Sequence, residues 1–206
     1  MPYSKSLRAR RAIRRVAAAT CFAFLAGAGS AAASCPAQPA STPFQQWGDT
    51  NSYFLVPGGS LEGTLDDIGW NLSNASLSQG NEPFSVGGPG DGQSLTINGG
   101  GSATTPFFCV DNSMAAMRFF AQQTAPSSDL QVEAVVRTRH GEVVKPIGHL
   151  TDGSTPWWAP TDPIDPGAGQ LPAWRTIMVA LRFEVPSADS SSWQIDDVYV
   201  DPYRSG

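Results

Sequence analysis

Few side chains in this sequence have the types and spacing that catalysis requires. There are two histidines, His140 and His149, and two adjacent carboxylate pairs, Asp66-Asp67 and Asp196-Asp197. A hairpin over residues 130–150 would bring the histidines near each other, but a metal site would need further ligands. Neighbouring residues of a strand point to opposite faces, so neither carboxylate pair alone forms the dyad of a glycosidase. Nucleophile-elbow, phosphate-loop, C-x-x-C and H-E-x-x-H motifs are absent from the sequence. We therefore predict a protein that is not an enzyme.

Tryptophans are the other side chains that could bind a ligand, because an indole ring stacks on the apolar face of a sugar. Trp157 and Trp158 are flanked by prolines, which keep this segment out of a central strand, so at least one indole is expected on a loop. Trp174 follows a proline-rich stretch and is expected at the same edge. Trp70 and Trp193 lie in apolar segments and are expected in the core. The alternative for Trp157 and Trp158 is that they only cover the core.

The N-terminus has the order of a secretory signal peptide. Residues 1–33 combine a basic head with six Lys and Arg residues, an apolar stretch from Val16 to Gly29, and the small residues Ser30–Ala33. The apolar stretch is too short to span a bilayer of ~30 Å. Without this segment 18 acidic and 7 basic residues remain, a formal charge of −11. Such a charge disfavours nucleic acid and anionic membrane surfaces as partners and suits hard cations such as Ca²⁺. We predict a secreted monomer without a membrane span.

Two cysteines remain after the predicted signal peptide, Cys35 and Cys109. An even number of cysteines outside the cell favours a disulfide. This bridge would close a loop of about 75 residues and stabilise the protein by roughly 4–5 kcal/mol through chain entropy. The alternative is that Cys35, which follows Ala32-Ala33-Ser34, is the lipid-modified first residue of a bacterial lipoprotein, and that Cys109 is then a free thiol.

The rest of the chain is predicted to be one β-rich domain over residues 44–203, preceded by a Pro- and Ala-rich linker over residues 34–43. Gly, Pro, Asp and Asn clusters separate the strand candidates, which are residues 52–56, 70–77, 83–86, 94–98, 106–110, 115–124, 130–139, 142–150, 175–185 and 193–200. Several segments alternate apolar and polar residues with period two, as residues 177–183 do. This pattern predicts an all-β, antiparallel β-sandwich or jelly roll.

Segments at the two ends of this domain resemble a known family. Val56–Gly63, followed by Gly69-Trp70, and the closing segment Trp193–Val200 are similar to the first and last strands of xylan- and glucan-binding carbohydrate-binding modules, which have a galactose-binding-like jelly roll. The chain also resembles a group of secreted actinobacterial proteins that share the Arg118–Phe120 and Asp197–Pro202 segments.

This resemblance implies a structural calcium ion. Family members hold Ca²⁺ between an opening Glu and a closing Asp, which correspond by position to Glu62 and Asp197. Two carboxylates that repel each other are stabilised by a cation that takes six to eight oxygen ligands. The alternative is that Glu62 is a solvated turn residue and Asp197 caps a strand.

Three hypotheses for function follow from the fold and the resemblance. The first is a non-catalytic module that binds polysaccharide through Trp157, Trp158 and Trp174, exposed over a concave sheet face. The second is a cell-envelope structural or interaction protein with the same fold and no sugar site, which would bury these indoles or show a flat apolar patch. The third is a small jelly-roll enzyme that degrades glycans, which would need two carboxylates about 5–10 Å apart in a groove.

Overall fold

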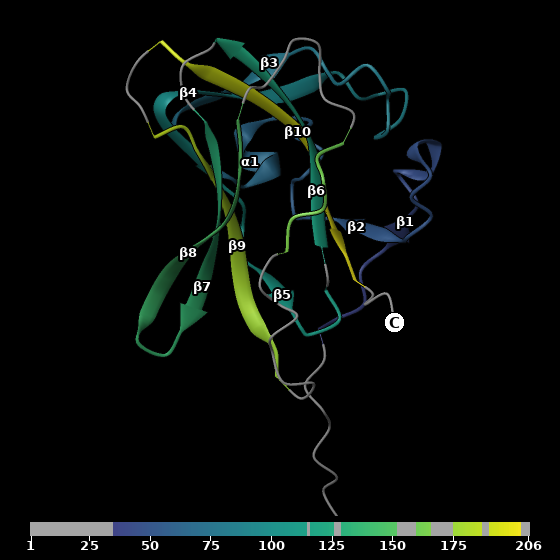
Figure 1. Ribbon diagram of the computed structural model, residues 1–206, viewed down its shortest axis with the longest axis vertical. Coiled ribbons are helices and arrows are strands. Elements are labelled where there is room, and N and C mark those ends of the chain that lie inside the picture. The colour runs from purple at the N-terminus through teal and green to yellow at the C-terminus, as the bar shows by residue number, and fades with distance from the viewer. Residues whose placement is uncertain are drawn as a thin grey trace, which may run out of the picture. The chain divides into compact units, whose positions relative to one another are not determined.

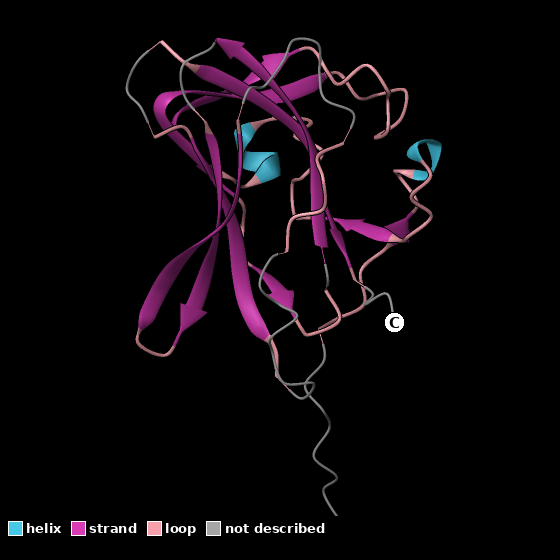
Figure 2. Cartoon of the chain, viewed as in Figure 1, coloured by secondary structure: helices cyan, strands magenta, loops and turns pink. Residues whose placement is uncertain are grey.

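The protein is built almost entirely from antiparallel strands (Figures 1 and 2). The computed structural model describes residues 35–114, 116–125, 129–151, 160–165, 175–186 and 190–202. The strands are β1 (Ala40–Ser41), β2 (Tyr53–Leu55), β3 (Asn71–Gln79), β4 (Gln93–Thr104), β5 (Phe108–Val110), β6 (Ala116–Ala125), β7 (Leu130–Thr138), β8 (Gly141–Leu150), β9 (Ile177–Glu184) and β10 (Ser192–Asp201). Two short helices, η1 (Gln45–Trp47) and α1 (Leu65–Ile68), complete the described part. The predicted all-β antiparallel fold is confirmed, and the predicted signal peptide lies outside the described residues.

One continuous path of hydrogen-bonded strands runs β1-β2-β10-β4-β9-β7-β8, with β3 beside β4, β5 beside β9 and β6 beside β10. Strand β4 belongs to both halves of this path, because residues 95–98 pair with β10 and residues 102–104 pair with β9. The bend lies at Gly99–Gly101, where a Cβ on Gly101 would come within 2.6 Å of the Asn74 carbonyl oxygen. The sequence led us to expect these glycines to end a strand. Instead they let β4 pass from the layer that contains β10 to the layer that contains β9.

Aromatic rings from both layers fill the core. Phe119 of β6 packs edge-on against Phe183 of β9 with ring centroids 5.0 Å apart, and Trp70 stacks on the same Phe183 ring at 5.9 Å. Trp193 of β10 is completely buried. The prediction that Trp70 and Trp193 lie in the core is confirmed.

A second aromatic cluster fixes the N-terminal segment to the sandwich. Phe44 packs edge-on against Tyr53 at 4.8 Å and against Tyr199 at 5.5 Å, and Phe120 lies below it at 6.0 Å. Arg118 of β6 closes this cluster, because its guanidinium lies 5.2 Å from the Phe44 ring and its Nη1 is 2.6 Å from the Asp49 carboxylate. The same guanidinium donates through Nε to the Thr161 carbonyl, so it also holds the extended segment 160–165 against β6.

Residues 35–43, which we expected to form a linker, belong to the domain. Cys35 forms the expected disulfide with Cys109, with Cα atoms 5.5 Å apart, and β1 pairs with β2. A sulfur in a disulfide cannot also carry a thioether-linked lipid. The predicted strand at residues 83–86 is wrong, since these residues form a loop in which Ser85 has a φ of +52°. No helix in the described part of the chain is long and apolar enough to cross a membrane.

Candidate metal centre and ligand groove

Three carboxylates converge where the loop between β3 and β4 meets the middle of β10. One oxygen from each of Glu82, Asp91 and Asp197 lies within 4.8 Å of the other two. Glu82 and Asp197 are buried, and Asp91 is half-buried. Three negative charges at such separations repel one another strongly in a medium of low dielectric constant, so they require protons or a cation to remain together.

A β-bulge in β10 turns Asp197 into this cluster. Asp196 pairs with Phe120, but the next pair along the ladder is Tyr199 with Arg118, so β10 has one residue more than β6. Asp197 takes the left-handed conformation, with a φ of +48°. Both Asp196 and Asp197 are therefore completely buried, although adjacent residues of a regular strand face opposite sides.

The loop over residues 80–92 is wrapped around its own carboxylates. Glu82 accepts hydrogen bonds from the backbone N–H groups of Phe84 and Val86, the second at 2.6 Å. Asp91 accepts one from the N–H of Gly87 at 3.2 Å. These contacts replace the ladder hydrogen bonds of a strand, which explains why the apolar residues Phe84 and Val86 do not form one.

Three of the carboxylate oxygens of this cluster lack hydrogen-bond partners within the described residues. Neither oxygen of Asp197 has a hydrogen-bond partner of normal geometry, and Oδ1 of Asp91 also has none, within the described residues. Burial raises the pKa of Asp197 to about 8, and the charges of Asp91 and Glu82 add to this shift. Burial and then the charge of Asp197 raise the pKa of Asp196 to about 9. The salt bridges of the described residues join other carboxylates to Arg118, Arg137 and Arg182, so no basic side chain neutralises the cluster there.

This donor set fits a hard divalent cation. Ca²⁺ takes carboxylate and carbonyl oxygens, and the unpartnered oxygens of Asp197 and Asp91 are of this kind. Glu62 lies beside the cluster: its Oε1 accepts the N–H groups of Gly92 and Gln93, both at 2.7 Å. Its charge contributes to the raised pKa of Asp197. The structure thus places the sequence-predicted Glu62 and Asp197 in one neighbourhood, although Glu62 is not one of the three converging carboxylates.

A groove on the outer face of the β4-β9-β7-β8 sheet is the second candidate site. Ala103 of β4 and Leu181 and Phe183 of β9 are buried in the core. The residues that alternate with them therefore point outward; these are Ser102, Thr104 and Arg182. The groove has a volume of about 570 Å³ and is lined by Gly69, Asn71, Ser102, Thr104, Thr105, Phe107, Val135, Glu142, Val144 and Arg182.

The one arginine that lines the groove among the described residues is paired with two carboxylates. The Nε of Arg182 lies 3.5 Å from Glu133, and an Nη2 contact joins the same guanidinium to Glu184. An arginine held between two carboxylates keeps a fixed orientation but attracts an anion weakly. The groove therefore offers hydroxyl, amide and guanidinium groups for hydrogen bonds without a net positive charge.

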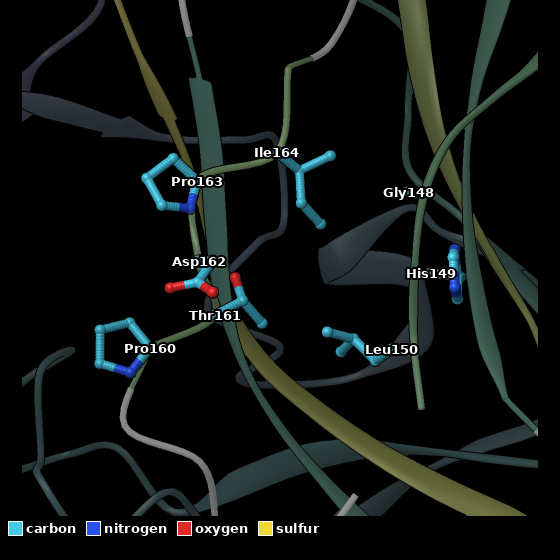
Figure 3. Close-up of a pocket in the computed structure, with 8 residues that line it drawn as sticks. All are labelled: Gly148, His149, Leu150, Pro160, Thr161, Asp162, Pro163 and Ile164. Carbon is cyan, nitrogen blue, oxygen red and sulfur yellow. The ribbon is translucent and has the colours of Figure 1, made fainter. Parts of the chain in front are cut away.

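A smaller pocket of about 370 Å³ lies between the end of β8 and residues 160–164. Figure 3 shows the apolar side chains of Leu150 and Ile164 inside it, with His149 and Asp162 on opposite sides. His140 is in the turn before β8 and His149 near its far end, about 30 Å away at 3.3 Å per residue. The hairpin thus separates the two histidines, and a shared metal site is excluded.

The other sequence-predicted ligand residues are Trp157, Trp158 and Trp174. All three lie outside the described residues. Glu82 and Asp91 were missed because they belong to an irregular loop, where neither periodicity nor a spacing motif marks ligands. The only signal for them was the number of acidic residues in a chain with few basic ones.

Similarity to known proteins is found among solved structures. No known family model matches the sequence, and no curated protein is similar to it. Among solved structures, the chain is similar to the CBM22-1 xylan-binding domain from Paenibacillus barcinonensis Xyn10C, with 12% identity over 83% of this chain and 100% of that one and a TM-score of 0.47.

Two further solved structures are similar to this chain. The Clostridium thermocellum xylanase 10B CBM22-1–GH10 modules, complexed with xylohexaose, match with 13% identity over 67% of this chain and a TM-score of 0.47. This chain spans 26% of that structure. The K1 cleaved adhesin domain of Lys-gingipain from Porphyromonas gingivalis matches with 16% identity over 64% of this chain and 89% of that one, with a TM-score of 0.40. Carbohydrate-binding modules are among the solved structures to which this chain is similar.

Proposed function

We propose that the chain is a non-catalytic extracellular module that binds a neutral polysaccharide and is stabilised by Ca²⁺. The observation that carries the binding proposal is the groove on the outer face of the β4-β9-β7-β8 sheet. Its polar groups are spread along neighbouring strands, so a chain of hydroxyl-bearing sugar units meets successive hydrogen-bonding groups. The two carboxylates beside Arg182 favour neutral over acidic sugars.

The calcium proposal concerns stability. Glu82, Asp91 and Asp197 would hold the ion, with Glu62 beside them, and the ion would neutralise a buried acidic cluster that has no basic partner. Because the cluster joins the 80–92 loop to β10, the ion would tie the loop to the sandwich. The groove is formed by other elements, so calcium is not expected to contact the polysaccharide.

The binding proposal is tested by affinity electrophoresis and pull-down on xylan, cellulose and chitin, with Ca²⁺ present throughout. Thr104→Val removes a hydroxyl from the groove while keeping its shape, and we expect it to weaken binding to the polymer that is retained. Thr50→Val is the matched control, because Thr50 is exposed in the loop before β2 and lies outside the groove. If the wild-type protein binds none of these polymers and no other neutral polysaccharide, the proposal is wrong and an interaction protein with the same fold takes its place.

A further inference from the structure

The aromatic wall of the groove is covered by an arginine. Phe107 is the one aromatic residue that lines the groove in the described part of the chain. The guanidinium carbon of Arg137 lies 3.7 Å from the centroid of the Phe107 ring. This is a close cation–π contact, and it covers one face of the ring.

The position of both side chains follows from the strands. Phe108 pairs with Val179 and points into the core, where it is 6% exposed, so Phe107 before it points to the outer face. Arg137 is near the end of β7, opposite Met178 of β9 and Glu142 of β8. The three neighbouring strands thus bring Arg137 and Phe107 together on the face that carries the groove.

Little holds Arg137 over the ring besides the ring itself. Its Nη2 lies 3.4 Å from Oε1 of Glu142, and the two side chains are 53% and 51% exposed. Exposed ion pairs and exposed cation–π contacts are both weak. Arg137 therefore contrasts with Arg182, which lies deeper between two carboxylates and is 32% exposed. A ligand can displace the first arginine at small cost but not the second.

We propose that Arg137 is a displaceable cap on Phe107 that determines which sugars the groove accepts. A saccharide with an apolar C–H face can stack on the Phe107 ring only after the Arg137 side chain has moved off that ring. A sugar that offers only hydroxyl groups gains no binding energy by displacing Arg137. The preferred ligand is thus a neutral polysaccharide whose sugar units have a flat apolar face. This inference rests on the proposed function and names a specificity-determining residue of that site.

The test measures oligosaccharide binding by isothermal titration calorimetry, with xylohexaose, cellohexaose and mannohexaose as probes. Arg137→Ala removes the cap, and we expect affinity for a stacking ligand to rise about three- to tenfold, since the ligand no longer displaces the cation–π contact. Phe107→Ala should weaken binding, and the double variant should bind no better than Phe107→Ala alone. Arg139→Ala is the matched control, because it removes the same charge from an exposed residue of the same hairpin without baring a ring. Thermal melts confirm that each variant is folded.

A second measurement observes the cap directly. In the free protein the Phe107 ring should shift the NMR signals of the Arg137 side chain upfield, and a saturating oligosaccharide should abolish this shift. Unchanged or weaker binding by Arg137→Ala, or the absence of a ring-current shift in the free protein, overturns the cap. Failure of the wild type and all variants to bind any neutral saccharide instead refutes the proposed function, and the cap with it.

Discussion

Replacing Asp197 by asparagine tests the metal centre at the residue where the structure is most specific. The amide keeps the shape of the side chain but removes the charge from the oxygens that have no partner in the described residues. A cation that binds only the folded protein, at a free concentration of 100 times its Kd, adds about 2.7 kcal/mol to the free energy of unfolding. For a domain of about 170 residues this raises the melting temperature by roughly 5–11 °C.

The assay compares melting temperatures in EDTA and in excess Ca²⁺ by differential scanning calorimetry. We expect the wild-type protein to show the full shift and Asp197→Asn to lose most of it. In EDTA the variant should melt at or above the wild type, because it removes one of three mutually repelling carboxylates. Asp66→Asn is the control, since Asp66 is exposed on α1 and its replacement changes the net charge equally.

Three results would refute this reasoning. Equal melting temperatures of the wild type in EDTA and in Ca²⁺ would show that the cluster holds no calcium. A full calcium shift in Asp197→Asn would show that the ion binds elsewhere. A lower melting temperature of the variant in EDTA would mean that Asp197 stabilises the bulge by itself, contrary to its raised pKa.

Three further predictions concern stability. In EDTA, the free energy of unfolding measured with urea should fall as the pH rises from about 5 to 9. The folded protein keeps protons on Asp196 and Asp197, whose pKa values are about 9 and about 8, whereas the unfolded chain releases these protons near pH 4. A free energy of unfolding that rises over this pH range contradicts the assignment. Cys35→Ser with Cys109→Ser should lower the free energy of unfolding by about 4 kcal/mol in urea titrations, since the loop between them is 74 residues long, and an unchanged denaturation midpoint would refute this. Phe183→Ala should cost about 3–5 kcal/mol in the same assay because it empties the space between Trp70 and Phe119; a loss below 1 kcal/mol would mean that the two layers repack.

Most strands could be predicted from the sequence because their apolar residues alternate. Residues 177–184 put Val179, Leu181 and Phe183 on one face, and that face is buried. The exceptions have local causes. At residues 83–86 the Glu82 side chain supplies hydrogen bonds that a ladder would otherwise supply. At residues 99–101 the glycines lie within a strand that we predicted to end at residue 98.

The candidate sites were less accessible from sequence. The resemblance led to Glu62 and Asp197, but Glu82 and Asp91 reach Asp197 only through the fold of an irregular loop. The bulge at Asp197 has no sequence signature, since Asp in the left-handed conformation depends on its tertiary surroundings. The groove combines residues from five strands and two loops, so its lining comes together only when β4, β9 and β7 have paired.

Strand β10 also sets the order of events during synthesis. It is the last strand of the described chain, yet it pairs with β2, β4 and β6, which are made much earlier (Figure 1). A nascent chain without residues 192–201 has β6 without its neighbour and β2 joined only to the two-residue β1. Because long-range pairing is slow, the sandwich can close only after these residues are released from the ribosome. The sandwich of a nascent chain therefore stays incomplete until synthesis of this strand is complete.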